Sequence, residues 1–133
     1  MSEYRLGFAG AGNMASAIIN GAVKKGVLSS DSVRVFDIDK TKLEALKALG
    51  IKAMGSLSEL CEESDIILLA VKPNVMNSVL TEIKSFDKPI VSIAAGWSAD
   101  MIKAVIGKDR RVLRLMPNTP LLVGEGMSVF ESP

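Results

Sequence analysis

A glycine-rich run between an apolar segment and a segment of helical period is the first pattern that could do chemistry. It reads Gly-Ala-Gly-Asn-Met-Ala and covers residues 10–15. In such a run the first glycine allows a tight turn, the second lets backbone amides approach a pyrophosphate, and the small last residue lets helix and strand pack closely. The anion would lie at the N-terminus of the helix, where free N–H groups and the helix dipole favour negative charge. The pattern predicts a dinucleotide site, against the alternative of a glycine turn that binds nothing.

Asp37 is the second candidate, because it stands at the end of the next apolar strand, 22 residues beyond Ala15. At about this spacing a carboxylate accepts hydrogen bonds from the adenosine ribose hydroxyls and repels a 2′-phosphate. Asp37 therefore favours NADH over NADPH, although Lys40 and Lys42 lie close enough to offset the repulsion. The alternative is that Asp37 only shares helix capping with Asp39.

Three further segments directly follow expected strands, at the edge of an open α/β sheet where ligands bind. They are residues 70–73 (Ala-Val-Lys-Pro), 92–96 (Ser-Ile-Ala-Ala-Gly) and 116–120 (Met-Pro-Asn-Thr-Pro). The small residues Ala94, Ala95 and Gly96 would let a flat ring lie against the backbone. Asn118 and Thr119 add directional hydrogen bonds. Each segment alone is uninformative, and Lys72 taken singly is more typical of a solvated lysine than of a ligand-binding one.

Composition narrows the possible functions. A net charge of +1 with no basic run argues against a nucleic-acid partner, and no apolar stretch approaches the ~20 residues of a membrane span, so we expect a cytoplasmic protein. The absence of histidine removes Ser-His-Asp hydrolysis and most catalytic zinc sites, and we expect no metal. The single cysteine, Cys61, is interpreted as a small buried hydrophobe on a helix.

Strand-like runs alternate with helical segments six times, which predicts a single α/β domain over residues 1–133, a doubly wound parallel sheet (Rossmann fold) in the order 3-2-1-4-5-6. Two helices are expected, one at Asn13–Lys25, ended by Gly26, and one at Asp39–Leu49, with Asp39 as N-cap. The apolar face of the first helix is expected to hold Met14, Ile18 and Ala22, which recur every four residues. Ser56 and Glu59 have the spacing of a capping box, and Asn74 and Ser98 are expected to begin the next two helices. In the helix that Asn74 begins, Val75, Val79 and Ile83 mark one apolar face. The expected strands are Tyr4–Ala9, Ser32–Phe36, Ile51–Met54, Asp65–Val71, Ile90–Ala94 and Arg111–Met116, with one more short strand at Met127–Phe130.

Taken together and in this order, the segments at residues 10–15, 70–73, 92–96 and 114–120 resemble the N-terminal cofactor-binding domain of the pyrroline-5-carboxylate reductase family. That family makes proline by reducing a cyclic imine with NADPH or NADH. The resemblance implies hydride transfer from the nicotinamide to the C=N carbon of 1-pyrroline-5-carboxylate. It also implies a helical C-terminal domain that forms the dimer and completes the imine pocket. This domain is absent here, so we expect a fragment without a complete active site, and a homo-oligomer only when that domain is present.

The resemblance also assigns roles by position. It gives the pyrophosphate to Ala9, Gly10, Ala11, Gly12, Asn13 and Met14, and the ribose to Asp37. It gives the nicotinamide half to Ala70, Val71, Lys72, Pro73, Ala94, Ala95 and Gly96, and the substrate side to Asn118 and Thr119. Two other functions stay open: a related imine or hydroxy-acid dehydrogenase, and a paralogue that binds the nucleotide without turnover.

Overall fold

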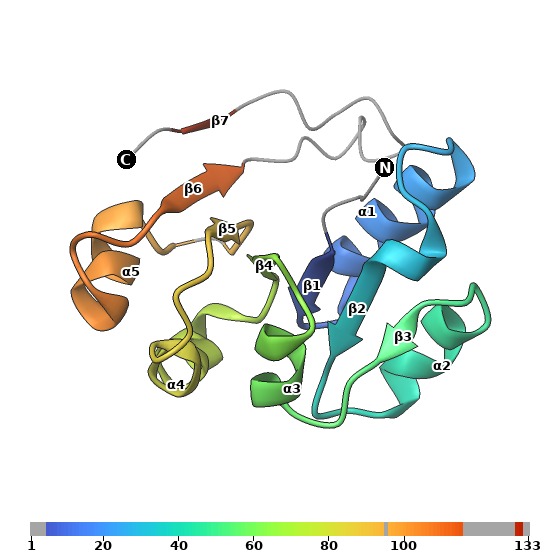
Figure 1. Cartoon of the computed structure of the whole chain (residues 1–133), viewed down its shortest axis with the longest axis horizontal. Coiled ribbons are helices and arrows are strands. Elements are labelled where there is room, and N and C mark those ends of the chain that lie inside the picture. Colours follow the sequence, from blue (N-terminus) through green and yellow to red (C-terminus); the bar gives the residue numbers. More distant parts are fainter. Residues whose placement is uncertain (1–4, 95, 116–129, 132–133) are drawn as a thin grey trace.

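The computed structural model describes residues 5–94, 96–115 and 130–131. Its strands are β1 (Leu6–Ala9), β2 (Val33–Phe36), β3 (Lys52–Ala53), β4 (Ile66–Leu69), β5 (Ile90–Ser92), β6 (Val112–Leu115) and β7 (Phe130–Glu131). Its helices are α1 (Asn13–Lys24), α2 (Thr41–Lys47), α3 (Leu57–Glu62), α4 (Pro73–Ile83) and α5 (Ala99–Ile106), with one 3-10 turn at Ser30–Ser32. These elements form one sheet covered by helices (Figure 1).

The strand order is β3-β2-β1-β4-β5-β6-β7. Strands β1 to β6 all pair in parallel, with β1 at the centre between β2 and β4. This confirms the predicted Rossmann fold and its order. β7 adds an antiparallel edge next to β6. It overlaps the predicted last strand only at Phe130, and residues 127–129 of that prediction lie outside the described part of the chain.

The two faces of the sheet are buried by different helices. Alternation along β4 shows this division, since Ile67 and Leu69 pack in the cluster formed with α3, α4 and α5, while Leu68 packs with α1 and α2. All three side chains are buried. A strand buried on both faces reads as an unbroken apolar run, which explains the sequence around residues 66–71.

Two predicted helix starts are confirmed by their caps. The Ser56 hydroxyl accepts the Glu59 N–H at 3.1 Å, and the Glu59 carboxylate in turn accepts the Gly55 N–H at 2.6 Å. The Ser98 hydroxyl accepts the Met101 N–H at 3.2 Å. Each bond satisfies backbone donors that a helix start would otherwise leave without a partner.

Two other predicted caps are wrong. α4 begins at Pro73 with Lys72 in the cap position, not after Asn74, because a proline has no N–H to satisfy and its fixed φ suits the first helical position. α2 begins at Thr41 with Lys40 in the cap position, and the Asp39 carboxylate instead accepts hydrogen bonds from the side chain and backbone N–H of Thr41. These bonds hold the pKa of Asp39 below its ordinary value.

The observed burial of side chains contradicts the prediction for Met14 and confirms the one for Cys61. Met14 was predicted on the apolar face of α1 with Ile18 and Ala22, but Met14 is 40% exposed, whereas the other two are buried. Met14 is the second residue of α1 and lies in its first turn. Cys61 is fully buried in α3, as predicted, and burial raises the pKa of its thiol to about 11. A thiol of this kind is a packing residue without nucleophilic character at neutral pH.

The predicted strands are mostly longer than the observed ones, because the apolar runs continue into the loops. Val71 and Ala94 lie beyond the ends of β4 and β5 yet pack against the core.

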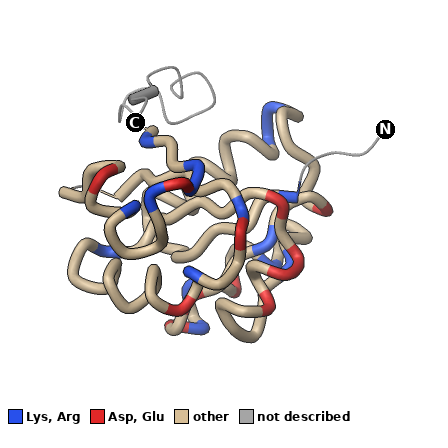
Figure 2. The backbone as a smooth tube through the Cα atoms, turned by 60° about the vertical axis from the view of Figure 1, so that its left-hand side comes forward, with Lys and Arg blue, Asp and Glu red and all other residues tan. Residues whose placement is uncertain are grey.

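Lys and Arg are interspersed with Asp and Glu along the described backbone (Figure 2). Among the described helices, none has the length and apolar character needed to cross a membrane.

Candidate functional site

The loop between β1 and α1 lies at the carboxyl edge of the sheet, and its first glycine is fixed by close packing. Gly10 donates its N–H to the Phe36 carbonyl at 2.8 Å and has a φ of +110°. A Cβ at this position would lie 2.7 Å from the carbonyl oxygen of Ala70. The positive φ and the close approach of the Ala70 carbonyl both exclude a side chain, so glycine at this position is required by the fold alone.

The second glycine is in the opposite situation. Gly12 has an ordinary φ of −73°, and a Cβ on it would meet nothing within 4 Å. It occupies the N-cap position of α1, where no side chain accepts from the first N–H groups of the helix. The space beside Gly12 is therefore open and faces N–H donors, which is the environment that an anion requires.

Asp37 lies beside this loop at the end of β2 and holds it in place. One carboxylate oxygen accepts the Ala11 N–H and the other accepts the Asp39 N–H, both at 2.8 Å. Asp37 therefore tethers the glycine loop to the next loop along the edge. Each carboxylate oxygen has a second lone pair, so the side chain can still accept a hydroxyl group.

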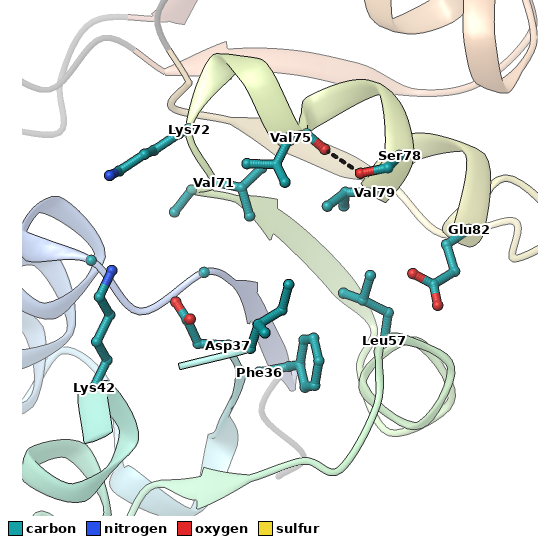
Figure 3. A pocket seen from close by; sticks show the side chains of 14 residues that line it. Phe36, Asp37, Lys42, Leu57, Val71, Lys72, Val75, Ser78, Val79 and Glu82 are labelled. Carbon is teal, nitrogen blue, oxygen red and sulfur yellow. Dashed lines mark hydrogen bonds between the residues drawn. The ribbon is translucent and has the colours of Figure 1, made fainter. Parts of the chain in front are cut away.

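A pocket of about 460 Å³ opens between this edge and α4 (Figure 3). Gly10, Gly12 and Asp37 line one side of it. The other lining residues come from the ends of β2 and β4 and from α2, α3 and α4. They are Phe36, Ile38, Lys42, Leu57, Ala70, Val71, Lys72, Val75, Ser78, Val79 and Glu82.

The charged residues of this pocket are separated along its length. Lys42 and Lys72 lie at one end and Glu82 lies at the other, with Asp37 between them (Figure 3). The lysine end adjoins the glycine loop. Two ammonium groups and the N–H donors of α1 make this end suited to a pyrophosphate.

The structure brings six of the predicted site residues together as lining of the pocket: Gly10, Gly12, Asp37, Ala70, Val71 and Lys72. The others in the described part of the chain do not line it. Ala9, Ala11 and Ala94 are buried, Asn13, Met14 and Pro73 are exposed at the helix starts, and Gly96 is exposed in the loop after β5. Ala95, Asn118 and Thr119 lie outside the described residues.

Sequence reasoning missed the contribution of α4. Val75 and Val79 were interpreted as a packing face, but both also line the pocket together with Ser78 and Glu82. These four positions have the spacing i, i+3, i+4, i+7, which places them on one face of a helix. The mixture of apolar and polar residues on this face is the signal that could have revealed them.

A second missed feature is a link between two loops. The indole N–H of Trp97 donates to the Pro73 carbonyl at 3.3 Å, and the ring packs partly buried against the core. It thereby joins the loop after β5 to the start of α4. Both predicted nicotinamide segments are connected through this contact.

Comparison with known proteins agrees with this geometry. Residues 5–96 match the family described as NADP oxidoreductase, coenzyme F420-dependent. The chain belongs to this oxidoreductase family. The matched residues include the glycine loop, Asp37 and α4, which are the parts that form the pocket.

Relatives and solved structures confirm the resemblance found in the sequence. The chain is 42% identical over 130 residues to pyrroline-5-carboxylate reductase of Escherichia coli (strain K12) and 38% identical over 132 residues to that of Glycine max. These matches cover 95% and 96% of this chain but 48% of each relative. The chain thus spans about half the length of the curated relatives it matches.

Among solved structures, a pyrroline-5-carboxylate reductase from Coxiella burnetii superposes with a TM-score of 0.85 at 29% identity, covering 92% of this chain and 47% of that one. Pyrroline carboxylate reductase of Plasmodium falciparum with NADP bound gives a TM-score of 0.84 at 31% identity, covering 100% of this chain and 49% of that one.

Proposed function

We propose that this chain binds a nicotinamide dinucleotide with the pyrophosphate between the glycine loop and the N-terminus of α1. The observation that carries the proposal is the open space beside Gly12, next to helix N–H groups that no side chain caps. Lys42 and Lys72 line the same end of the pocket. In this arrangement the backbone N–H groups of Asn13 and Met14, in the first turn of α1, would contact the anion. Ala9 and Ala11 would support the loop instead, because the Ala9 carbonyl accepts the Ala70 N–H and the Ala11 N–H donates to Asp37.

We further propose that the chain is the cofactor-binding half of a pyrroline-5-carboxylate reductase, which makes proline. The similarity to relatives of that name along nearly the whole chain supports this function. The bound nicotinamide would supply a hydride for the C=N carbon of 1-pyrroline-5-carboxylate. The loops at residues 70–73 and 94–96 would position the nicotinamide, and Asn118 and Thr119 would face the substrate.

The remainder of the active site belongs, in this proposal, to sequence that this chain does not contain. The chain covers 48% of the length of its relative from Escherichia coli (strain K12), and the family resemblance implies a helical domain that forms the dimer and closes the imine pocket. The chain of 133 residues alone should therefore bind cofactor and turn over poorly. A homo-oligomer and a cytoplasmic location stay predictions.

NADH is the cofactor that we propose as preferred. Asp37 lines the pocket beside the glycine loop, and its charge opposes a 2′-phosphate. Lys42 also lines the pocket and acts in the opposite direction, while Lys40 lines a smaller neighbouring pocket. A lysine on a flexible, solvated stem reduces the preference without reversing it.

Two measurements test the proposal. Calorimetry with the 133-residue chain should show binding of NADH, with weaker binding of NADPH. The product of the whole gene should oxidise NADH in the presence of 1-pyrroline-5-carboxylate, and more slowly with other cyclic imines or 2-oxo acids. Activity only with another substrate would identify a related dehydrogenase, and binding without any turnover would identify a non-catalytic paralogue.

A further inference from the structure

The end of the pocket farthest from Lys42 and Lys72 is lined by apolar and acidic side chains, which have no role in binding a pyrophosphate. Val75, Ser78, Val79 and Glu82 form one wall of it, along a single face of α4. Leu57, at the start of α3, lies across from them (Figure 3). No phosphate-binding feature is found among these residues.

The side chains that form the walls of this end are mostly apolar. Val79 and Leu57 are 7% and 6% exposed, and Val75 and Phe36 are half-buried. Ile38, which directly follows Asp37 in the chain, also lines the pocket and is 82% exposed. An exposed isoleucine beside such walls offers one more apolar surface to a flat ring.

The polar groups at this end are acceptors. The Ser78 hydroxyl donates to the Val75 carbonyl at 3.0 Å, so it presents lone pairs to the pocket. Glu82 is an exposed carboxylate, which accepts and does not donate when ionised. The ligand group at this end must therefore carry N–H or O–H donors.

Charge fixes the direction of the ligand in the pocket. Glu82 would repel a phosphate, whereas Lys42 and Lys72 attract one. Between residues 72 and 82 the rise of α4 separates the two ends by about 15 Å. The pocket thus suits an elongated ligand with an anionic end and a flat, uncharged ring with an amino group at the other.

With the pyrophosphate at the glycine loop, the proposed dinucleotide would have its adenine ring at this end of the pocket, and we propose that Glu82 accepts a hydrogen bond from the 6-amino group of that ring. The inference rests on the proposed dinucleotide function and adds the determinant of base specificity. Hypoxanthine has a carbonyl oxygen in place of the amino group, and this oxygen would face the carboxylate. Glu82 therefore selects adenine over hypoxanthine.

The test uses calorimetry on the 133-residue chain with NADH and with reduced nicotinamide hypoxanthine dinucleotide, which differ at that one position of the base. The wild-type chain should bind NADH about tenfold more tightly, since a hydrogen bond to a charged group is lost in the analogue. Glu82→Gln should bring the two affinities within about twofold of each other, because an amide can both donate and accept.

Glu62→Gln is the matched control, since Glu62 is exposed on α3, carries the same charge and does not line the pocket. It should keep the tenfold ratio. Equal affinities in the wild-type chain, or a ratio unchanged by Glu82→Gln, would overturn the role of Glu82 while NADH binding still supports the proposed function. Binding of neither dinucleotide would overturn both.

Discussion

The two walls of the pocket are built in different ways. The glycine loop presents backbone, and its shape depends on close contacts at Gly10 and on hydrogen bonds to Asp37. The wall on α4 presents side chains from a regular helix, whose backbone would be the same with other residues facing the pocket. A change in the first wall therefore alters folding or the whole site, while a change in the second alters recognition of one part of the ligand.

The largest effect is expected from Gly10→Ala. The new Cβ would lie 2.7 Å from the Ala70 carbonyl oxygen at a φ of +110°, so the strained backbone and the overlap add. We expect the free energy of unfolding to fall by about 3 kcal/mol or more. Urea denaturation of mutant and wild-type chains measures the loss. A mutant as stable as the wild-type chain would show that β1 and β4 do not pack as closely as described.

Gly12→Val, two residues beyond Gly10, is expected to weaken cofactor binding without destabilising the fold to the same degree. The space for the new side chain is open, so the free energy of unfolding should fall by only about 1 kcal/mol or less, which is the effect of a poor helix N-cap residue. NADH affinity should fall by about 100-fold or more, because the side chain occupies the place of the pyrophosphate and blocks charged hydrogen bonds of about 1.5–3 kcal/mol each. NADH fluorescence titration measures this loss.

Gly12→Ala is the graded control, since a single methyl group fills less of that space and should weaken binding less than valine does. Unchanged affinity in both variants would remove the pyrophosphate from the glycine loop. A large loss of stability in both would mean that Gly12 is needed for folding in the same way as Gly10.

The contrast between the walls also explains what could be predicted from the sequence. The glycine loop, the strand order and Asp37 were found because backbone geometry restricts residue types at fixed spacings. The role of α4 was missed because Val79 serves the core and the pocket at once, so its apolar character indicates only packing. The Asn74 cap was wrong because a proline at the first helical position competes with a side-chain cap for the same start.

Tertiary hydrogen bonds had no sequence signal at all. The second function of Asp37, as an acceptor for the Ala11 N–H, joins residues 26 positions apart. Trp97 and Pro73 are 24 positions apart. Neither spacing follows from helix or strand periodicity, so only the packed fold reveals these links.

Asp37→Ser tests the loop wall for cofactor choice. Loss of the carboxylate removes the repulsion of a 2′-phosphate, about 1.4 kcal/mol in a partly solvated site, so the ratio of NADPH to NADH affinity should rise roughly tenfold. Both affinities should also fall together, because the Ala11 N–H loses its acceptor. Calorimetry with both cofactors separates the ratio from the common loss.

Asp39→Ser controls for charge in this comparison. It removes one carboxylate two residues away, at an exposed position where serine can still accept the Thr41 N–H. The ratio should change much less than in Asp37→Ser. If the wild-type chain binds NADPH more tightly than NADH, the lysines decide the preference and the assignment of Asp37 fails.

The smallest effect is expected from Trp97→Phe, which tests whether the start of α4 is positioned from outside the helix. Phenylalanine keeps an aromatic ring against the core but cannot donate to the Pro73 carbonyl. If this bond holds the two loops proposed to position the nicotinamide, NADH affinity should fall by about fivefold, the equivalent of about 1 kcal/mol, while ADP-ribose affinity stays the same. ADP-ribose lacks the nicotinamide ring, so calorimetry with both ligands distinguishes positioning from general destabilisation. Met101→Leu, an exposed change on α5, should alter neither affinity. Equal losses for both ligands in Trp97→Phe would mean that the indole stabilises the whole pocket, and the separation of the α4 wall from the loop wall would then be lost.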